Sequence, residues 1–180
     1  MRGLFALASM LGNTRGMAAT PPLDADEELL WRSLMRLTNT VPRAMGDDLE
    51  RSSGLNGTEY LVLMHLSEAP GRRLRMSDLA DRLALSPSRI TRVVDLLASR
   101  DLVSKEPDPD DGRSMLAVLT RQGLALLKAA WPEHLQSVRR NIFDPLADDE
   151  IRKLGPVLRR LADAVDAANP APPRRSAKRP

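Results

Sequence analysis

The stretch MSDLADRLALSPSRITRVVDLLAS, residues 76–99, decides the fold. Its apolar residues recur at helical spacing in two separate blocks. Between the blocks, Ser86 suits the N-cap of a helix and Pro87 suits its first turn. The stretch therefore predicts two short helices, over about 76–83 and about 87–99, joined by a tight turn. A second helix that is amphipathic and polar at its start is typical of a helix-turn-helix.

The residues after this stretch change from a helical to an alternating period. We expect strands over about 102–106 and about 114–119, because apolar and polar residues alternate there. The run PDPDDG at 107–112 separates them, and its content of Pro and Asp predicts a turn. A hairpin directly after a helix-turn-helix forms a wing. The fold class is therefore expected to be mainly α with a small β-hairpin, a winged helix-turn-helix.

Four further helices are expected outside these elements. Apolar residues recur at helical spacing over about 24–49, 57–67, 121–141 and 148–167. Asn56 and Glu59 have the spacing of a capping box at the start of the second of these helices. Pro42 and Pro132 predict kinks in the first and the third. In the last helix, five apolar residues are expected to face inward: Ile151, Leu154, Leu158, Leu161 and Val165.

The two ends of the chain differ in composition from the rest. An apolar run at 4–11 faintly resembles a signal peptide, but it is too short to span a membrane. We favour instead a disordered extension over 1–22, or a start codon placed upstream of Met17. Residues 168–180 are Pro-rich and basic, and a disordered basic tail is expected there. No other stretch is apolar enough to cross a bilayer, so we expect a cytoplasmic protein.

Charge and composition exclude several function classes. The 180 residues carry a net charge of +3, and four of the 27 basic residues lie within 174–179, so overall charge is weak evidence for a nucleic-acid partner. The absence of cysteine excludes disulfides and thiol-based redox sensing. The two histidines, His65 and His134, lie far apart in sequence, so neither a metal site nor a cofactor is expected. Since no nucleophile elbow or phosphate loop occurs either, we expect no enzyme activity.

The start of the second helix of the helix-turn-helix carries candidate DNA contacts. No Asp or Glu occurs from Ser86 to Val94, although acids there would suit the helix dipole. Arginine can bond both acceptors on a guanine edge, and hydroxyls reach phosphates or base edges. The alternative is an ordinary solvated helix face. The candidate residues are Ser86, Ser88, Arg89, Thr91 and Arg92.

Arg113, at the end of the turn in the wing, is a further candidate DNA contact. Arginine at a hairpin tip can insert into a narrow minor groove, where the potential is most negative. Asp111 lies two residues before it and could hold the guanidinium in position. The alternative is a solvated turn with a local ion pair, which contributes little.

These segments together resemble the MarR family of transcriptional regulators. The resemblance covers roughly 24–167. In the wing it lies in Asp111-x-Arg113 followed by Leu119-Thr120, and in the wing-tip run at 108–111. In the helix-turn-helix it lies in Leu79-Ala80, Ser86-Pro87-Ser88, the run at 91–97 and the run at 100–103. The sequence departs from the family pattern at Arg75, where a capping Thr is common. It departs again at Ala147, where a Ser is common.

The resemblance implies a homodimer with a helical dimerisation region at 23–53 and 120–167 and a DNA-binding winged helix-turn-helix at 54–119. It also implies that the recognition helix and the wing contact DNA through the candidates named above. Members of the family usually respond to small, often aromatic or phenolic molecules, bound between the dimerisation helices and the DNA-binding lobe. Candidate lining residues, with the alternative that each belongs to the core, are Trp31, Met35, Thr38, Tyr60, Met64 and His65.

The sequence therefore predicts a sequence-specific DNA-binding transcriptional regulator, with a repressor released by a small ligand as the expected mode. Its partners would be a pseudo-palindromic double-stranded operator, a second copy of the chain and a small-molecule effector. Two-fold docking would place the half-sites about one helical turn apart. The alternative is a winged-helix protein-interaction module without DNA binding, and the polar, acid-free start of the recognition helix argues against it.

Overall fold

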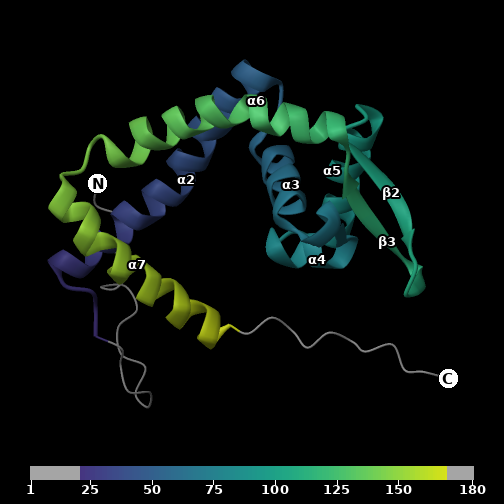
Figure 1. Cartoon of the computed structure of the whole chain (residues 1–180). Helices are drawn as coiled ribbons and strands as arrows, with labels where there is room; N and C mark the ends of the chain where they lie inside the picture. The colour runs from purple at the N-terminus through teal and green to yellow at the C-terminus, as the bar shows by residue number, and fades with distance from the viewer. Residues whose placement is uncertain (1–20, 170–180) are drawn as a thin grey trace, which may run out of the picture. The chain divides into compact units, whose positions relative to one another are not determined.

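The computed structural model in Figure 1 describes residues 21–169, with the exception of the Arg113 side chain. Most of the two ends expected to be disordered, 1–22 and 168–180, lies outside these residues. The helices are α2 (Ala25–Ser53), α3 (Gly57–Glu68), α4 (Met76–Arg82), α5 (Pro87–Ser99), α6 (Arg121–Val138) and α7 (Asp148–Ala168). The remaining elements are a 3-10 turn η1 (Pro70–Arg72), a π-helical turn η2 (Arg139–Phe143) and strands β1 (Arg73–Arg75), β2 (Val103–Asp108) and β3 (Asp111–Leu119).

The chain divides into two compact units between Thr40 and Val41, inside α2. The hydrophobic core lies in the second unit, where α3, α4 and α5 gather beside the hairpin of β2 and β3 (Figure 1). Leu63 of α3, Leu79 of α4 and Leu97 of α5 are fully buried in this core. The helix-turn-helix is therefore held by its apolar faces, which leaves the polar faces of the same helices outward.

Three helices of the second unit begin directly after a residue whose side chain caps the helix N-terminus. Asn56 and Glu59 form the expected capping box, with the Asn56 side chain accepting from the Glu59 amide at 2.9 Å and the Asn56 amide donating to the Glu59 carboxylate at 3.0 Å. Ser86 caps α5, with Pro87 in its first turn, and Thr120 accepts from the Gly123 amide at 2.9 Å to cap α6. These hydrogen bonds satisfy amides that the helix itself leaves without partners.

The sheet is larger than the expected hairpin. It has three antiparallel strands in the order β1-β3-β2, and β1 has only one apolar residue, Leu74, between two arginines. A strand this short shows no readable alternation, so it was missed. The expectation of a turn over all of 107–112 is also wrong, because β2 continues through Pro107 to Asp108 and β3 begins at Asp111. Proline is tolerated there because β2 is an edge strand.

The third of the expected helices is shorter than predicted. Helix α6 ends at Val138, and the chain continues in the wider turn η2 instead of reaching Asn141 as a regular α-helix. Pro132 lies inside α6 and Pro42 lies inside α2 without ending either helix. Within the described residues, no helix is long and apolar enough to cross a membrane.

Helix α7 has the expected bounds to within one residue, but its apolar row does not face inward in the single chain. Ile151 is half-buried, and the other members of the row are exposed by 41–52%: Leu154, Leu158, Leu161 and Val165. The inward expectation is therefore wrong for one copy, because no described element of the second unit covers this row. A row of large apolar side chains left in water favours association with another surface.

Candidate nucleic-acid interface

The start of α5 presents a polar surface of the second unit. Ile90 and Val94 are buried against the core, whereas Ser88, Arg89, Thr91 and Arg92 are exposed. Among the described residues, neither Arg89 nor Arg92 forms an ion pair, so both guanidiniums keep their donors for a partner outside the chain. The structure thus brings the five sequence-predicted residues of this helix start together at one helix end.

The hydroxyls at this helix start are already oriented by local hydrogen bonds. The Ser86 hydroxyl accepts from the Arg89 amide and lies 3.2 Å from the Ser88 hydroxyl. The Thr91 hydroxyl donates to the Pro87 carbonyl at 2.9 Å. Because its proton is used in this way, Thr91 can approach DNA through its methyl group or its remaining lone pair, not as a donor.

The electrostatics of α5 favour an anion at its N-terminus. The helix has no acid in its first turn, and its only carboxylate, Asp95, is paired with Lys105 of β2 at 2.5 Å. The amides at a helix N-terminus and the aligned peptide dipoles attract phosphate. Together with Arg89 and Arg92, this arrangement can bind a phosphate backbone while the side chains reach base edges.

The wing carries the other predicted DNA contacts. Arg113 lies in β3, and its side chain is outside the described part of the structure. Asp111 lies at the first position of β3 and accepts a hydrogen bond from the Ser114 hydroxyl at 2.7 Å. That Asp111 holds the Arg113 guanidinium stays a prediction.

An ion pair that sequence reasoning missed lies at the base of the wing. The Arg75 Nε atom donates to Asp108 Oδ2 at 2.5 Å, and Asp108 is only 4% exposed. The hydrogen bond that Arg75 donates to Asp108, together with the charge of Asp108, raises the pKa of Arg75, and the nearby charges of Asp111 and Asp78 add to the effect. The partners are 33 positions apart in the sequence, so the pair left no local signal.

A cleft of about 750 Å³ lies beside α5. Residues 41–50 of α2, the start of α3, and Arg89 and Val93 of α5 line it. Tyr60 of α3 and His134 of α6 also line it, with their ring centroids 4.4 Å apart. The cleft therefore places an apolar surface directly behind a residue of the candidate DNA interface.

Two of the residues that line this cleft carry a buried polar atom. Within 21–169, neither the Tyr60 hydroxyl nor His134 Nδ1 has a hydrogen-bond partner. Burial raises the pKa of Tyr60 and lowers the pKa of His134, so both groups are neutral near pH 7. Buried polar atoms without partners are costly, which makes the two groups candidates for hydrogen bonds to a bound molecule.

The predicted ligand residues are divided between the two compact units of the chain. Tyr60 lines the cleft, and with Met64 it also lines a second cavity of about 310 Å³, whereas His65 lines neither. The remaining three predicted residues lie in the first unit, where the Thr38 hydroxyl donates to the Met35 carbonyl and Trp31 is exposed. Sequence reasoning missed His134 as a lining residue, and its one signal was that of a lone histidine in α6. In the described part of the chain, no cluster of His, Asp or Glu could hold a metal ion.

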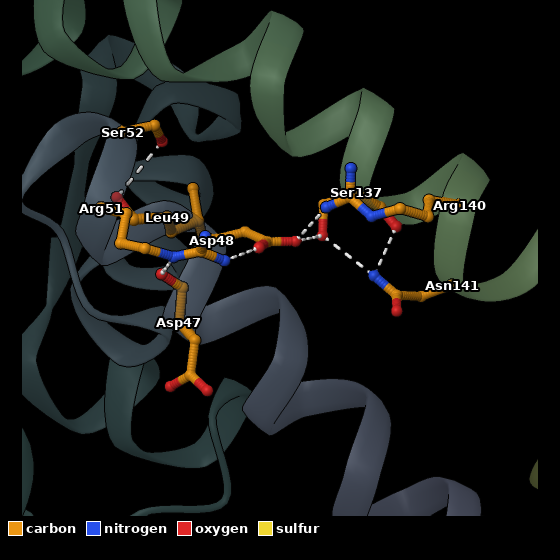
Figure 2. A network of polar contacts seen from close by, with 8 residues as sticks. All are labelled: Asp47, Asp48, Leu49, Arg51, Ser52, Ser137, Arg140 and Asn141. Carbon is orange, nitrogen blue, oxygen red and sulfur yellow. Dashed lines mark hydrogen bonds and ion pairs between the residues drawn. The ribbon is translucent and has the colours of Figure 1, made fainter.

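A buried polar network ties the end of α2 to the end of α6. Asp48 accepts a hydrogen bond from the fully buried Ser137 hydroxyl at 2.5 Å and contacts Arg140 and Arg51 (Figure 2). The bond from Ser137, with the charges of the two arginines, lowers the pKa of Asp48 despite its burial. Asn141 in η2 donates to the Ser137 carbonyl at 2.8 Å, which holds the π-helical turn against the same network.

Comparisons with known proteins agree on one family. A sequence model of the MarR family matches residues 53–114, from the end of α2 into the wing. The chain is 28% identical over 125 residues to the HTH-type transcriptional regulator MhqR of Bacillus subtilis, covering 66% of this chain and 82% of MhqR. It is 29% identical over 143 residues to the HTH-type transcriptional repressor YetL of the same organism, covering 78% of this chain and 85% of YetL.

A solved structure agrees over a still larger share of the chain. Sco3205, a MarR family transcriptional regulator from Streptomyces coelicolor solved in complex with DNA, has a TM-score of 0.76 and 31% sequence identity to this chain. The match covers 86% of this chain and 95% of Sco3205. The mainly helical fold, the three-stranded wing sheet and this coverage lead to one conclusion: the chain belongs to the MarR family of winged-helix transcriptional regulators.

Proposed function

We propose that this chain is a sequence-specific DNA-binding repressor that acts as a homodimer on a pseudo-palindromic operator in the cytoplasm. The observation that carries the proposal is the acid-free start of α5, where Arg89 and Arg92 are exposed without ion pairs in the described chain. The relative Sco3205 was solved bound to DNA and YetL is named a repressor, which supports the same role here. Members of the family are transcription regulators, in keeping with the expectation that the chain is not an enzyme.

In the proposed complex, α5 enters the major groove with its N-terminus first. Arg89 and Arg92 would reach guanine edges or phosphates, and the serine hydroxyls at 86 and 88 would bond the backbone. The wing would lie along the adjacent minor groove with Arg113 inserted. In this complex α5 would read the base sequence, whereas the phosphate contacts and the wing would position the protein on the duplex.

A gel-shift titration over a salt range tests DNA binding. We expect the logarithm of the binding constant to fall linearly with the logarithm of salt concentration, because phosphate contacts release counterions. Arg92→Ala should cost about 1–3 kcal/mol on a selected operator. Arg152→Ala, which removes an exposed arginine of α7 instead, is the matched control and should change little. Binding that is insensitive to salt, or equal losses in the two variants, would contradict the proposal.

Pairing of two copies is supported by the exposed apolar row of α7. Leu154, Leu158, Leu161 and Val165 recur along one side of a 21-residue helix, and each is exposed by more than 40%. A second copy related by a two-fold axis would present the same row, so that the two rows could bury one another. Such pairing would also supply the second recognition helix that a pseudo-palindromic operator requires.

We propose further that a small effector, expected to be aromatic, binds in the cleft beside α5 and releases the repressor. The Tyr60 hydroxyl would serve as a hydrogen-bond donor and neutral His134 as the second polar group, in a surface that is otherwise mostly apolar. Arg89 lines both the cleft and the DNA-facing helix start, so an occupant could change its position directly. Thermal-shift screening against small aromatic acids tests this, since binding to the folded state raises the melting temperature. A screen in which hits shift wild type and Tyr60→Phe equally would argue against this cleft.

A further inference from the structure

A partly buried ion pair, in addition to the pairing of β1 with β3, links the wing hairpin to the start of the helix-turn-helix. Arg75 is the last residue of β1 and the N-cap residue of α4, and it lies opposite Leu116 of β3. Its guanidinium reaches across β3 to Asp108, on the far edge strand β2. The contact therefore connects the first helix of the helix-turn-helix with the strand that leads to the wing tip.

The same carboxylate also closes the turn of the wing. Asp108 Oδ2 accepts from Arg75, and Asp108 Oδ1 accepts from the amide of Asp110 at 3.0 Å. The pairing between β2 and β3 is irregular at this point, with a register shift between Pro107 and Asp108. Where the regular ladder is interrupted, the side chain of Asp108 therefore supplies two of the contacts that hold the tip. A carboxylate that is 4% exposed needs such hydrogen-bonding partners to offset the cost of its burial.

We propose that Arg75 and Asp108 form a wing latch that positions the wing for DNA while contacting no base itself. A two-stranded hairpin is marginally stable alone, and a loose wing would have to be ordered at the moment of binding. The latch fixes the wing relative to α4, and α4 packs on α5. Wing and recognition helix are thereby presented together, so that the two can enter neighbouring grooves at once. This inference rests on the DNA-binding function proposed above.

Because Asp108 is negatively charged, a role in positioning the wing and a role through charge alone predict opposite changes in DNA affinity when the carboxylate is removed. Removing a carboxylate near a DNA-binding surface reduces repulsion and should strengthen binding if charge alone matters. If the latch positions the wing, Asp108→Asn should instead weaken binding to a selected operator, by about tenfold. Asp95→Asn is the matched control, because it removes one carboxylate from the Lys105–Asp95 pair, which links β2 to α5 and is far more exposed. That variant should bind as tightly as wild type or more tightly.

The experiment measures affinity of the full chain for its selected operator and for a random duplex, by fluorescence anisotropy at fixed salt. We expect Asp108→Asn to lose affinity for the operator and not for the random duplex, and to lose hydrogen-exchange protection at the Asp110 amide. Asp108→Asn binding the operator as well as Asp95→Asn would overturn the latch. Wild-type protein that binds no duplex would instead overturn the proposed function, so the two failures can be told apart.

A second pair of variants covers the case in which Asp108→Asn fails to fold. Arg75→Gln leaves the buried carboxylate with a weaker donor, and Arg73→Gln removes the same charge from the exposed end of β1. The latch predicts that Arg75→Gln loses at least about tenfold more operator affinity than Arg73→Gln. Equal losses would show that Arg75 acts only through its charge and would overturn the latch.

Discussion

Substitution of Gly123 by alanine should destabilise this protein, although the same change in most helices is favourable. Gly123 lies in the first turn of α6, directly against the wing hairpin. A Cβ atom there would lie 2.1 Å from the Leu102 carbonyl oxygen and 2.8 Å from Leu119 Cδ1. The carbonyl cannot turn away cheaply, because it accepts from the Thr120 amide at 3.2 Å and from the Thr120 hydroxyl at 3.1 Å.

The magnitude follows from two opposing effects. Alanine is favoured over glycine in a helix interior by about 1 kcal/mol. Overpacking against backbone costs about 1–3 kcal/mol, and the forced shift would also strain the capping bond from the Gly123 amide to Thr120, worth about 1 kcal/mol. We therefore expect Gly123→Ala to lower the free energy of unfolding by about 1–3 kcal/mol, and the melting temperature by about 2–10 °C.

Urea and thermal unfolding, followed by circular dichroism at one protein concentration, measure this effect. Gly46→Ala is the matched control, because Gly46 lies inside α2 and an added Cβ would meet only the Gly57 amide, at 3.9 Å. That variant should gain up to about 1 kcal/mol. A Gly123→Ala variant as stable as Gly46→Ala would show that the Leu102 carbonyl tolerates the added Cβ, contrary to this prediction.

Three further outcomes are expected. Asp48→Asn should lower stability at pH 7 by about 1–3 kcal/mol and flatten the acid limb of a stability–pH curve. A carboxylate whose pKa is lowered by folding stabilises the folded state at pH values above its unfolded pKa, which is near 3.9. That stabilisation is lost as the pH falls through the folded pKa. An acid limb that is unchanged in the variant would contradict this prediction. Tyr60→Phe should leave the free energy of unfolding unchanged or raise it by up to about 1 kcal/mol, because the buried hydroxyl has no partner within 21–169, and a clear loss in urea unfolding would oppose that reading. Leu158→Asp should dissociate the proposed dimer, as measured by sedimentation, and should therefore weaken operator binding. A variant that remains a dimer would show that the interface does not involve this row of α7.

The recognition helix could be predicted closely from sequence because its signals are local. Ser86 and Pro87 mark the start of α5 within one turn, and the structure has the expected bounds, Pro87–Ser99. The sequence predicted that the wing is a β-hairpin, but it did not predict how far the two strands extend. Proline usually argues against a strand, and only the edge position of β2 explains why Pro107 continues the ladder.

The features that could not be predicted depend on contacts between distant residues. Ser137 and Asp48 are 89 residues apart, and Arg75 and Asp108 are 33 apart, so neither pair leaves a periodic pattern. The place of His134 in the cleft lining also depends on distant residues, because the packing of α6 on α3 brings it next to Tyr60. The row on α7 shows the opposite case. Its apolar period was read correctly, but period alone does not say whether the same chain or a second copy covers it.

Selection of bound sequences from a random pool of duplex DNA is the sharpest test of whether two copies of this chain read DNA together. We expect an enriched inverted repeat whose half-sites are centred about one helical turn apart, because two copies of α5 must enter the same face of the duplex. Pools selected by Arg92→Ala should lose information at base pairs within each half-site. A pool that shows no enrichment, or a single unrepeated site, would contradict the claim that paired recognition helices read DNA.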